Sequence, residues 1–435
     1  MSKKILLVAG LLFGIINNVA ARKVTMGVDS VLERIATNNA DVRAAQSGYQ
    51  IARQGIKIAE SAKLPDVSMS LDLNYLGDGT VLDRDFGNAM RDKLPHFGNT
   101  LSVNLYQPVY QGGAITVGIE LAKLQSELAE TGITQQAETS AIEALSAYFN
   151  LMKMYNLQKV YVENIALTRK LIQQMQERQT QGTALKNDVT RYELRLSSLT
   201  YDLQSVENTI SILNNKLVSL LGMSASDIIE PIQTTQPECN ESEEYWQQLT
   251  SLSSSDLHAI DKTLQINNTE NKLIQASRLP SVGIVIGDQL TGPITFEIPA
   301  LNKNYNAWYA GVSIKYNLSS LWTSNKKLEQ NKLQKIHITD TRQAVAAGLS
   351  RRIHDAYTNM LQARQMLDTE LLNVRLANEN YEVVDTRFKN DMALLTDMLD
   401  ASTAKLDSEV RLVNAGINLI LAYYQLKYIS GTLYN

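Results

Sequence analysis

The feature that most constrains this sequence is an internal repeat. A Leu-Pro pair at Leu64 and Pro65 recurs 215 residues later at Leu279 and Pro280. Three further matches are each displaced by 209 residues: Tyr148-Phe149-Asn150-Leu151 with Tyr357-Thr358-Asn359-Met360, Asp188-Val189 with Asp397-Met398, and Leu221-Gly222 with Ser430-Gly431. Self-similarity at a nearly constant offset indicates that one structural unit occurs twice. The fold must therefore provide two equivalent places for the same order of elements.

The repeat predicts how the 435 residues are organised. We expect a first repeat over residues 22–222, a linker over 223–255 and a second repeat over 256–435. The linker contains Pro231, Pro237 and three consecutive serines, which interrupt regular structure.

Residues 1–21 have the pattern of a secretory signal peptide. Lys3 and Lys4 precede a twelve-residue apolar run, and Val19-Ala20-Ala21 offers small residues for cleavage. The run is too short to span a bilayer, so we expect the mature chain to begin near Arg22, outside the cytoplasm. No later stretch approaches the length of a transmembrane helix, so no helical anchor is predicted.

Each repeat is expected to supply one hairpin of β-strands after its Leu-Pro pair, because proline ends a helix and favours extended backbone before it. Polar and apolar residues alternate with a period of two, as in half-buried strands. The predicted strands cover about 66–76 and 99–109 in the first repeat and about 281–290 and 306–318 in the second. Aromatic residues near their ends suit a membrane interface: Tyr75, Tyr106, Trp308 and Tyr316.

The remaining sequence predicts long helices, consistent with only eight prolines. Apolar residues at three-, four- and seven-residue spacings resemble a coiled coil. A helix of sixty residues would be roughly 90 Å long. The predicted helices cover about 28–63, 113–181 and 184–222, and about 256–278, 322–389 and 394–431.

Composition excludes several functions. The net charge of −4 argues against nucleic acid as a partner, and the single cysteine, Cys239, excludes an intramolecular disulfide. No nucleophile elbow, phosphate-binding loop or zinc-hydrolase motif occurs, so we expect no enzyme. The four histidines are scattered, so we expect neither a metal nor a cofactor: His96, His258, His337 and His354.

Strands of nine to eleven residues with one apolar face fit the thickness of an outer membrane. The alternative from alternation alone is a small soluble sheet packed on the helices. If the strands lie in lipid, four cannot close a barrel, and open edges would leave backbone groups unpaired. The barrel would then be shared, with eight strands in a dimer or twelve in a trimer, and a conduit favours twelve.

Several segments resemble the TolC-like outer membrane efflux proteins. They are Ala59-Glu60-Ser61-Ala62-Lys63-Leu64-Pro65 with its copy ending at Pro280, Gln107-Pro108-Val109-Tyr110-Gln111-Gly112-Gly113, Thr396-Asp397-Met398-Leu399-Asp400-Ala401, and Ser430-Gly431-Thr432-Leu433. The resemblance implies a mostly α-helical chain with long, duplicated coiled-coil hairpins and four strands per protomer. It also implies a homotrimer with a 12-strand barrel and an α-helical tunnel.

Two details depart from the family pattern. Gly182 marks the first interhelical turn, but Asp391 stands 209 residues later, where a second glycine is expected. The Pro-Gly-Gly exit of the first repeat is replaced in the second by Leu318-Ser319-Ser320-Leu321-Trp322.

Asp397 and Asp400 are the candidate site residues. They are three positions apart and therefore share a helix face. The resemblance implies a place at the tapered periplasmic end, where three subunits would supply six carboxylates to a pore constriction and gate that favours cations. The alternative is a pair of solvated acids that stabilise a helix N-terminus.

The sequence thus predicts an outer-membrane exit duct of a tripartite efflux or type I secretion system, located in the outer membrane of a Gram-negative bacterium and extending into the periplasm. The expected partners are two further copies, a periplasmic adaptor, an inner-membrane transporter and outer-membrane lipid. The alternative is a periplasmic coiled-coil adaptor or scaffold protein.

Overall fold

The computed structural model describes residues 22–238 and 240–434, so the predicted signal peptide and Cys239 lie outside the described residues. The described chain divides into two compact units. We call residues 44–135 and 254–348 the sheet unit, and residues 22–43, 136–253 and 349–434 the helical unit. Each unit therefore contains segments from both repeats.

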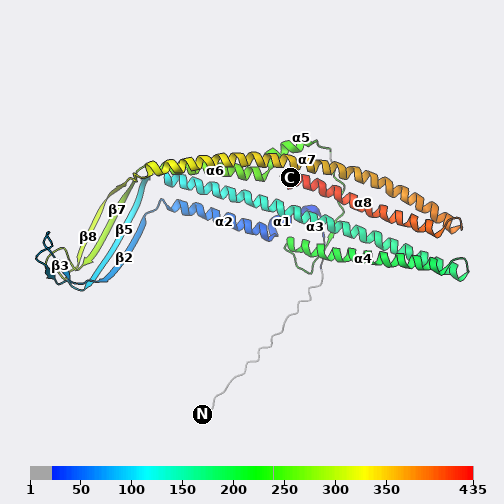
Figure 1. Ribbon diagram of the computed structural model, residues 1–435, viewed down its shortest axis with the longest axis horizontal. Helices are drawn as coiled ribbons and strands as arrows, with labels where there is room; N and C mark the ends of the chain where they lie inside the picture. The colour runs from blue at the N-terminus through cyan, green and yellow to red at the C-terminus, as the bar shows by residue number, and fades with distance from the viewer. Residues whose placement is uncertain (1–21, 239, 435) are drawn as a thin grey trace, which may run out of the picture. The chain divides into compact units, whose positions relative to one another are not determined.

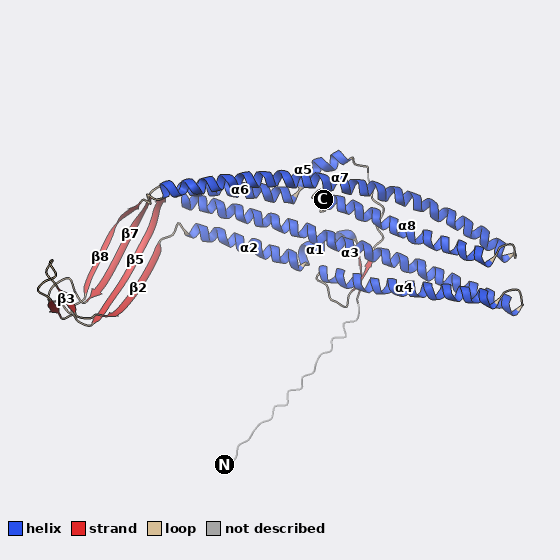
Figure 2. Cartoon of the chain, in the orientation of Figure 1, coloured by secondary structure: helices blue, strands red, loops and turns tan. Residues whose placement is uncertain are grey.

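The sheet unit contains a four-stranded antiparallel sheet in the order β2-β5-β7-β8 (Figure 2). The strands are β2 (Asp66–Tyr75), β5 (Phe97–Gln111), β7 (Ser281–Gly292) and β8 (Tyr305–Lys315). The pairing of β5 with β7 joins the two hairpins into one sheet, leaving β2 and β8 as its edges. A short hairpin of β3 (Gly79–Val81) and β4 (Met90–Asp92), which the sequence analysis did not predict, lies between β2 and β5 along the chain.

The strand register separates an apolar face from a polar face, because directly opposed residues lie on the same side of a sheet. On β2 the apolar face carries Val67, Met69, Leu71, Leu73 and Tyr75, and all of them are exposed. Trp308 lies on the same face.

Tyr106 does not lie on the apolar face, although it was predicted to be an interfacial aromatic residue. It lies opposite Asp66 on the polar face, and its ring covers Gly283, where a Cβ atom would collide with it.

The helices occur in pairs of similar length. The structure contains α2 (Ala40–Ser61) and α6 (Ser255–Ala276) with 22 residues each, and α4 (Lys186–Leu220) and α8 (Leu395–Ile429) with 35 each. The two longest helices are α3 (Ala114–Thr180) and α7 (Ser320–Lys389), with 67 and 70 residues (Figure 1). The second repeat enters α7 without a Pro-Gly-Gly turn, because the Asn317 carbonyl accepts both the amide and the hydroxyl of Ser320.

The single helix predicted over 28–63 is wrong, since the structure contains α1 (Val28–Asn38) and α2 separated by Asn39. The Asn39 side chain accepts hydrogen bonds from the amides of Asp41 and Val42 at 2.9 and 3.1 Å, and donates one to the Leu220 carbonyl at 2.9 Å. An asparagine that satisfies the first amides of a helix favours a helix start at that point. This buried side chain therefore ends the continuity of the predicted helix.

The predicted linker contains two regular elements. Strand β6 (Ile228–Pro231) pairs in parallel with β1 (Lys23–Met26), and α5 (Glu243–Ser253) buries Trp246 against Tyr423. Within the described residues, no helix combines the length and the apolar character needed to cross a lipid bilayer.

Candidate functional site: the paired interhelical turns

The helical unit contains two equivalent turns, one between α3 and α4 and one between α7 and α8. In the first, the Thr183 amide donates to the Arg178 carbonyl at 2.9 Å, and in the second the Met392 amide donates to the Arg387 carbonyl at 2.8 Å. This hydrogen bond is typical of a helix C-terminus in which the residue before the donor has a left-handed backbone conformation, as Gly182 and Asp391 do here. Both turns therefore have the same backbone design, despite the missing second glycine.

Asp391 takes the place of that glycine. Its φ is +59°, compared with +75° at Gly182. A left-handed conformation costs most L-residues about 1–2 kcal/mol, although aspartate tolerates it better than most. In return, the second turn carries a carboxylate that the first turn lacks.

That carboxylate connects the two hairpins. Arg178, at the end of α3, places Nη1 2.9 Å from Oδ1 of Asp391. Its Nη2 donates to the Phe388 carbonyl at 3.2 Å, and its guanidinium lies 5.0 Å from the centroid of the Phe388 ring. Three interactions thus join α3 to the end of α7, and we call this group of residues the tip contact.

The repeat does not duplicate the tip contact. The arginine equivalent to Arg178 is Arg387, and its Nη2 donates to the Met392 carbonyl of its own turn at 3.3 Å. Gly182, the equivalent of Asp391, has no side chain to receive an arginine. Arg178 therefore joins the two hairpins, whereas Arg387 stabilises only its own turn.

A hydrophobic cluster next to the turns packs α3, α4, α7 and α8 together. Its buried members are Leu171, Ile172, Met175, Val189, Tyr192, Tyr381, Phe388, Met398 and Ala401. Burial raises the pKa of Tyr381 to about 12. Because each helix contributes to this cluster, separating the hairpins would expose apolar surface.

Asp397 and Asp400 lie at the start of α8, and both are exposed. Oδ2 of Asp397 accepts the Leu394 amide at 3.0 Å, and the equivalent Asp188 accepts the Leu185 amide at 2.9 Å. Asp397 therefore has the contact expected of a helix-capping acid. The other exposed carboxylate, that of Asp400, lies three positions further along α8.

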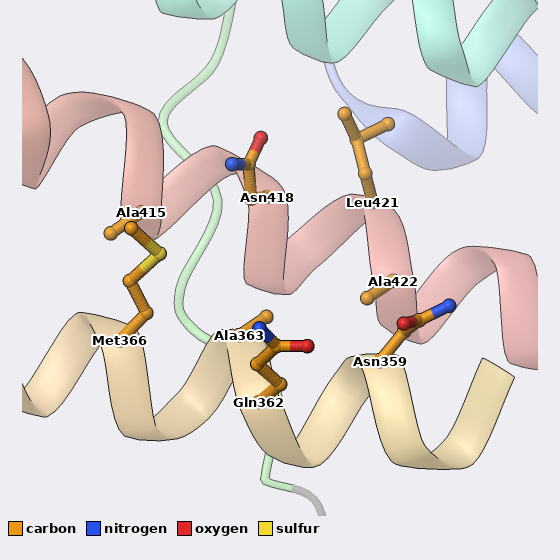
Figure 3. Close-up of a pocket in the computed structure, with 8 residues that line it drawn as sticks. All are labelled: Asn359, Gln362, Ala363, Met366, Ala415, Asn418, Leu421 and Ala422. Carbon is orange, nitrogen blue, oxygen red and sulfur yellow. The ribbon is translucent and has the colours of Figure 1, made fainter. Parts of the chain in front are cut away.

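A groove of about 290 Å³ lies between α7 and α8, where the side chains of Met366 and Ala415 face each other (Figure 3). None of its lining residues is ionisable: Asn359, Gln362, Ala363, Met366, Ala415, Asn418, Leu421 and Ala422. It therefore offers no acid, base or nucleophile. No cluster of three metal-ligating side chains occurs in the part of the chain that the structure describes.

Sequence comparison relates the chain to outer-membrane proteins. The pattern of the outer membrane efflux protein family matches residues 31–223. The outer membrane protein TolC of Vibrio cholerae is 28% identical over 134 residues, which are 30% of this chain. The match spans only 28% of the length of that relative.

Comparison with solved structures extends the likeness to nearly the whole chain. VceC of Vibrio cholerae superposes with a TM-score of 0.74 at 15% identity, over 93% of this chain and 96% of that one. The CusC channel gives 0.75 at 13% identity, over 96% of both chains. The CmeC channel of Campylobacter jejuni gives 0.74 at 14% identity, over 93% of this chain and 86% of that one.

The fold is therefore that of a mostly helical outer-membrane channel. Residues 31–223 thus carry the pattern of the outer membrane efflux proteins, the family that the motifs resemble, and the chain has the fold of solved outer-membrane channels. The family consists of export channels rather than enzymes.

Proposed function

We propose that three copies of this chain form the exit duct of a tripartite efflux or type I secretion system. The observation that carries the proposal is the open sheet. All ten residues of edge strand β2 are exposed, and so are most apolar residues of the apolar face on the other three strands. In lipid, unpaired strand edges cost several kcal/mol for each unsatisfied group, so the edges must meet those of other copies. Three four-stranded sheets would close a barrel of twelve strands.

The helices carry matching features. Leu194, Tyr201 and Ile212 of α4 are more than half exposed, at intervals of seven and eleven residues. Such intervals keep apolar residues on one side of a helix. A second exposed series lies on α7 at Leu372, Leu376 and Val383. We propose that these two series pack against neighbouring copies in the wall of a helical tunnel.

The gate of this duct would lie at the interhelical turns. The tip contact ties α3 to α7, and the hydrophobic cluster beside it holds the four helices together. Asp397 and Asp400 would line the constriction, where six carboxylates from three copies would favour cations.

Opening of the gate requires partners, since the chain has no phosphate-binding loop with which to use nucleotide energy. A periplasmic adaptor and an inner-membrane transporter would supply the energy, the choice of substrate and the force that separates the turns.

The test is to extract the protein from isolated outer membranes in detergent, measure its mass, and record conductance in planar bilayers. We expect a detergent-dependent trimer that forms ion-conducting pores. The matched control lacks residues 305–315, which form edge strand β8, and should neither trimerise nor conduct. A soluble monomer in the periplasmic fraction would refute the duct and support the adaptor or scaffold alternative.

A further inference from the structure

One charged side chain lies on the wrong face of the sheet. Within β2, β5, β7 and β8, Asp66, Asp72 and Lys315 belong to the polar face. Asp288 instead belongs to the apolar face, in the series Val282, Ile284, Ile286, Asp288 and Leu290. If this face meets lipid, as the proposed function requires, Asp288 is a carboxylate placed against the membrane.

The surroundings of Asp288 on this face are apolar. It lies opposite Val103 on one side and Trp308 on the other, with Ile286 and Leu290 above and below it along β7. Asn306 donates a hydrogen bond from Nδ2 to Oδ1 of Asp288 at 2.8 Å. This bond fixes the carboxylate but provides no positive charge, and Asp288 is exposed. Its second oxygen is therefore available to a group outside the protein.

The position of Asp288 along β7 indicates which layer of the membrane its carboxylate would meet. β7 leaves α6 at Ser281 and ends at Gly292, so Asp288 lies nearer the loop end of the sheet than the helix end (Figure 1). Its cross-strand neighbour Trp308 is 75% exposed on the apolar face. Exposed tryptophan is typical of the boundary between hydrocarbon and headgroups. Asp288 thus reaches the headgroup layer of the leaflet on the loop side.

A carboxylate at this boundary carries only a small free-energy cost, and a cation beside it would remove this cost and add an electrostatic attraction. Headgroup phosphates repel a carboxylate directly but share oxygen-preferring divalent ions with it. We propose that Asp288, positioned by Asn306, binds a divalent cation that bridges the barrel to anionic, phosphate-bearing lipid headgroups. The protein supplies one carboxylate, and lipid phosphate and water supply the remaining oxygen ligands.

The test uses the full-length protein in phosphatidylcholine vesicles with and without phosphatidic acid, and follows the melting temperature of the trimer during Mg²⁺ addition. With phosphatidic acid, we expect Mg²⁺ to raise the melting temperature of the wild type by a few degrees, and chelation to reverse the effect. Asp288→Asn keeps the shape of the side chain and should lose most of the shift, whereas Asp288→Glu should retain it. Asp72→Asn, a change on the polar face, is the matched control and should respond like the wild type.

Three results would overturn the bridge. Equal Mg²⁺ shifts in the wild type and Asp288→Asn would show that the carboxyl group takes no part. An equal wild-type shift in phosphatidylcholine alone, whose phosphate is balanced by choline, would show that no anionic lipid takes part. Stabilisation by phosphatidylethanolamine without metal would assign the carboxylate to a headgroup ammonium. Failure of the wild type to enter vesicles as a trimer would refute the proposed duct as well, which separates the two hypotheses.

Discussion

At the scale of single residues, Arg178 offers the most direct test of the gate. Replacing it with alanine removes the ion pair with Asp391 and both contacts with Phe388. Asp391 is 82% exposed, so each ion pair contributes at most about 1 kcal/mol. Three copies acting together would shift the ratio of open to closed channels by roughly ten- to a hundredfold. We expect Arg178→Ala to increase open time in planar-bilayer recordings.

The control is Arg387→Ala, which removes the equivalent arginine but only a bond within its own turn. If both variants open the channel equally, the tip contact is not what restrains it.

The carboxylates at the start of α8 belong to the same scale. Asp400→Asn removes a charge from an exposed position, so we expect normal folding but lower selectivity for cations over anions. Asp397→Asn should do the same and also loses a favourable charge near the helix N-terminus, about 0.3–1 kcal/mol, while its amide oxygen can still accept the Leu394 amide. Asp188→Asn loses the equivalent charge in the first repeat and shows how much this effect alone contributes. Unchanged reversal potentials in the Asp397→Asn/Asp400→Asn double variant would exclude pore lining by these residues.

At the scale of elements, the helix ends depend on left-handed residues. Gly182→Ala adds a Cβ atom that meets nothing within 4 Å, so its cost should be the backbone penalty of about 1–2 kcal/mol alone. Gly222→Ala carries the same penalty and also places Cβ 2.8 Å from the Asn38 carbonyl oxygen. Thermal unfolding followed by circular dichroism should therefore show the larger loss for Gly222→Ala. Equal losses would mean that the end of α1 and the end of α4 shift apart without cost.

The sequence was informative about elements wherever a periodic pattern was long. The alternation of polar and apolar residues in β2 and the spacing of apolar residues in α3 are properties of the local sequence. They can therefore be recognised without knowledge of tertiary contacts. The break at Asn39 could have been suspected from an asparagine followed by Ala40 and Asp41, which is a helix-start pattern. By contrast, β1 and β6 are four residues each and pair across more than 200 positions, so no local signal predicts them.

The candidate site was only partly predictable. Asp397 was found because its motif recurs, and its capping role follows from its place at a helix start. The tip contact was missed because Arg178 and Asp391 come from different repeats, and their meeting depends on how the hairpins pack. Asp288 was missed because Val285 blurs the alternation of its strand, so the pairing with β5 and β8 was needed to assign the two faces.

At the scale of the whole molecule, buried tyrosines make the fold sensitive to alkali. The hydroxyl of Tyr148 donates to the carbonyls of Met26 and Ile232, and burial raises its pKa from 10.0 to about 12. The folded state therefore holds this proton more tightly than the unfolded state. The resulting stability is complete below about pH 10 and is lost as the pH rises towards about 12.

Tyr148→Phe should lower the stability near neutral pH by about 0.5–1.5 kcal/mol, because the hydrogen bonds of the hydroxyl with Met26 and Ile232 are lost. It should also make the decline in melting temperature between pH 10 and 12 shallower. Tyr245→Phe, a change at an exposed tyrosine of α5, is the control and should change neither quantity. A decline as steep as that of the wild type in Tyr148→Phe would show that its proton is not linked to folding.

The two edges of the sheet have a consequence for genetics. Strands β2 and β8 differ in sequence, so in the proposed barrel each copy offers β8 to one neighbour and β2 to the other, and no copy can be left out. A gene copy encoding a chain with a defective β8 would then be dominant over a normal one. With equal expression of both, only roughly one trimer in eight would contain three sound chains. Partial loss of such a duct should therefore follow the cube of the fraction of normal protein rather than the fraction itself.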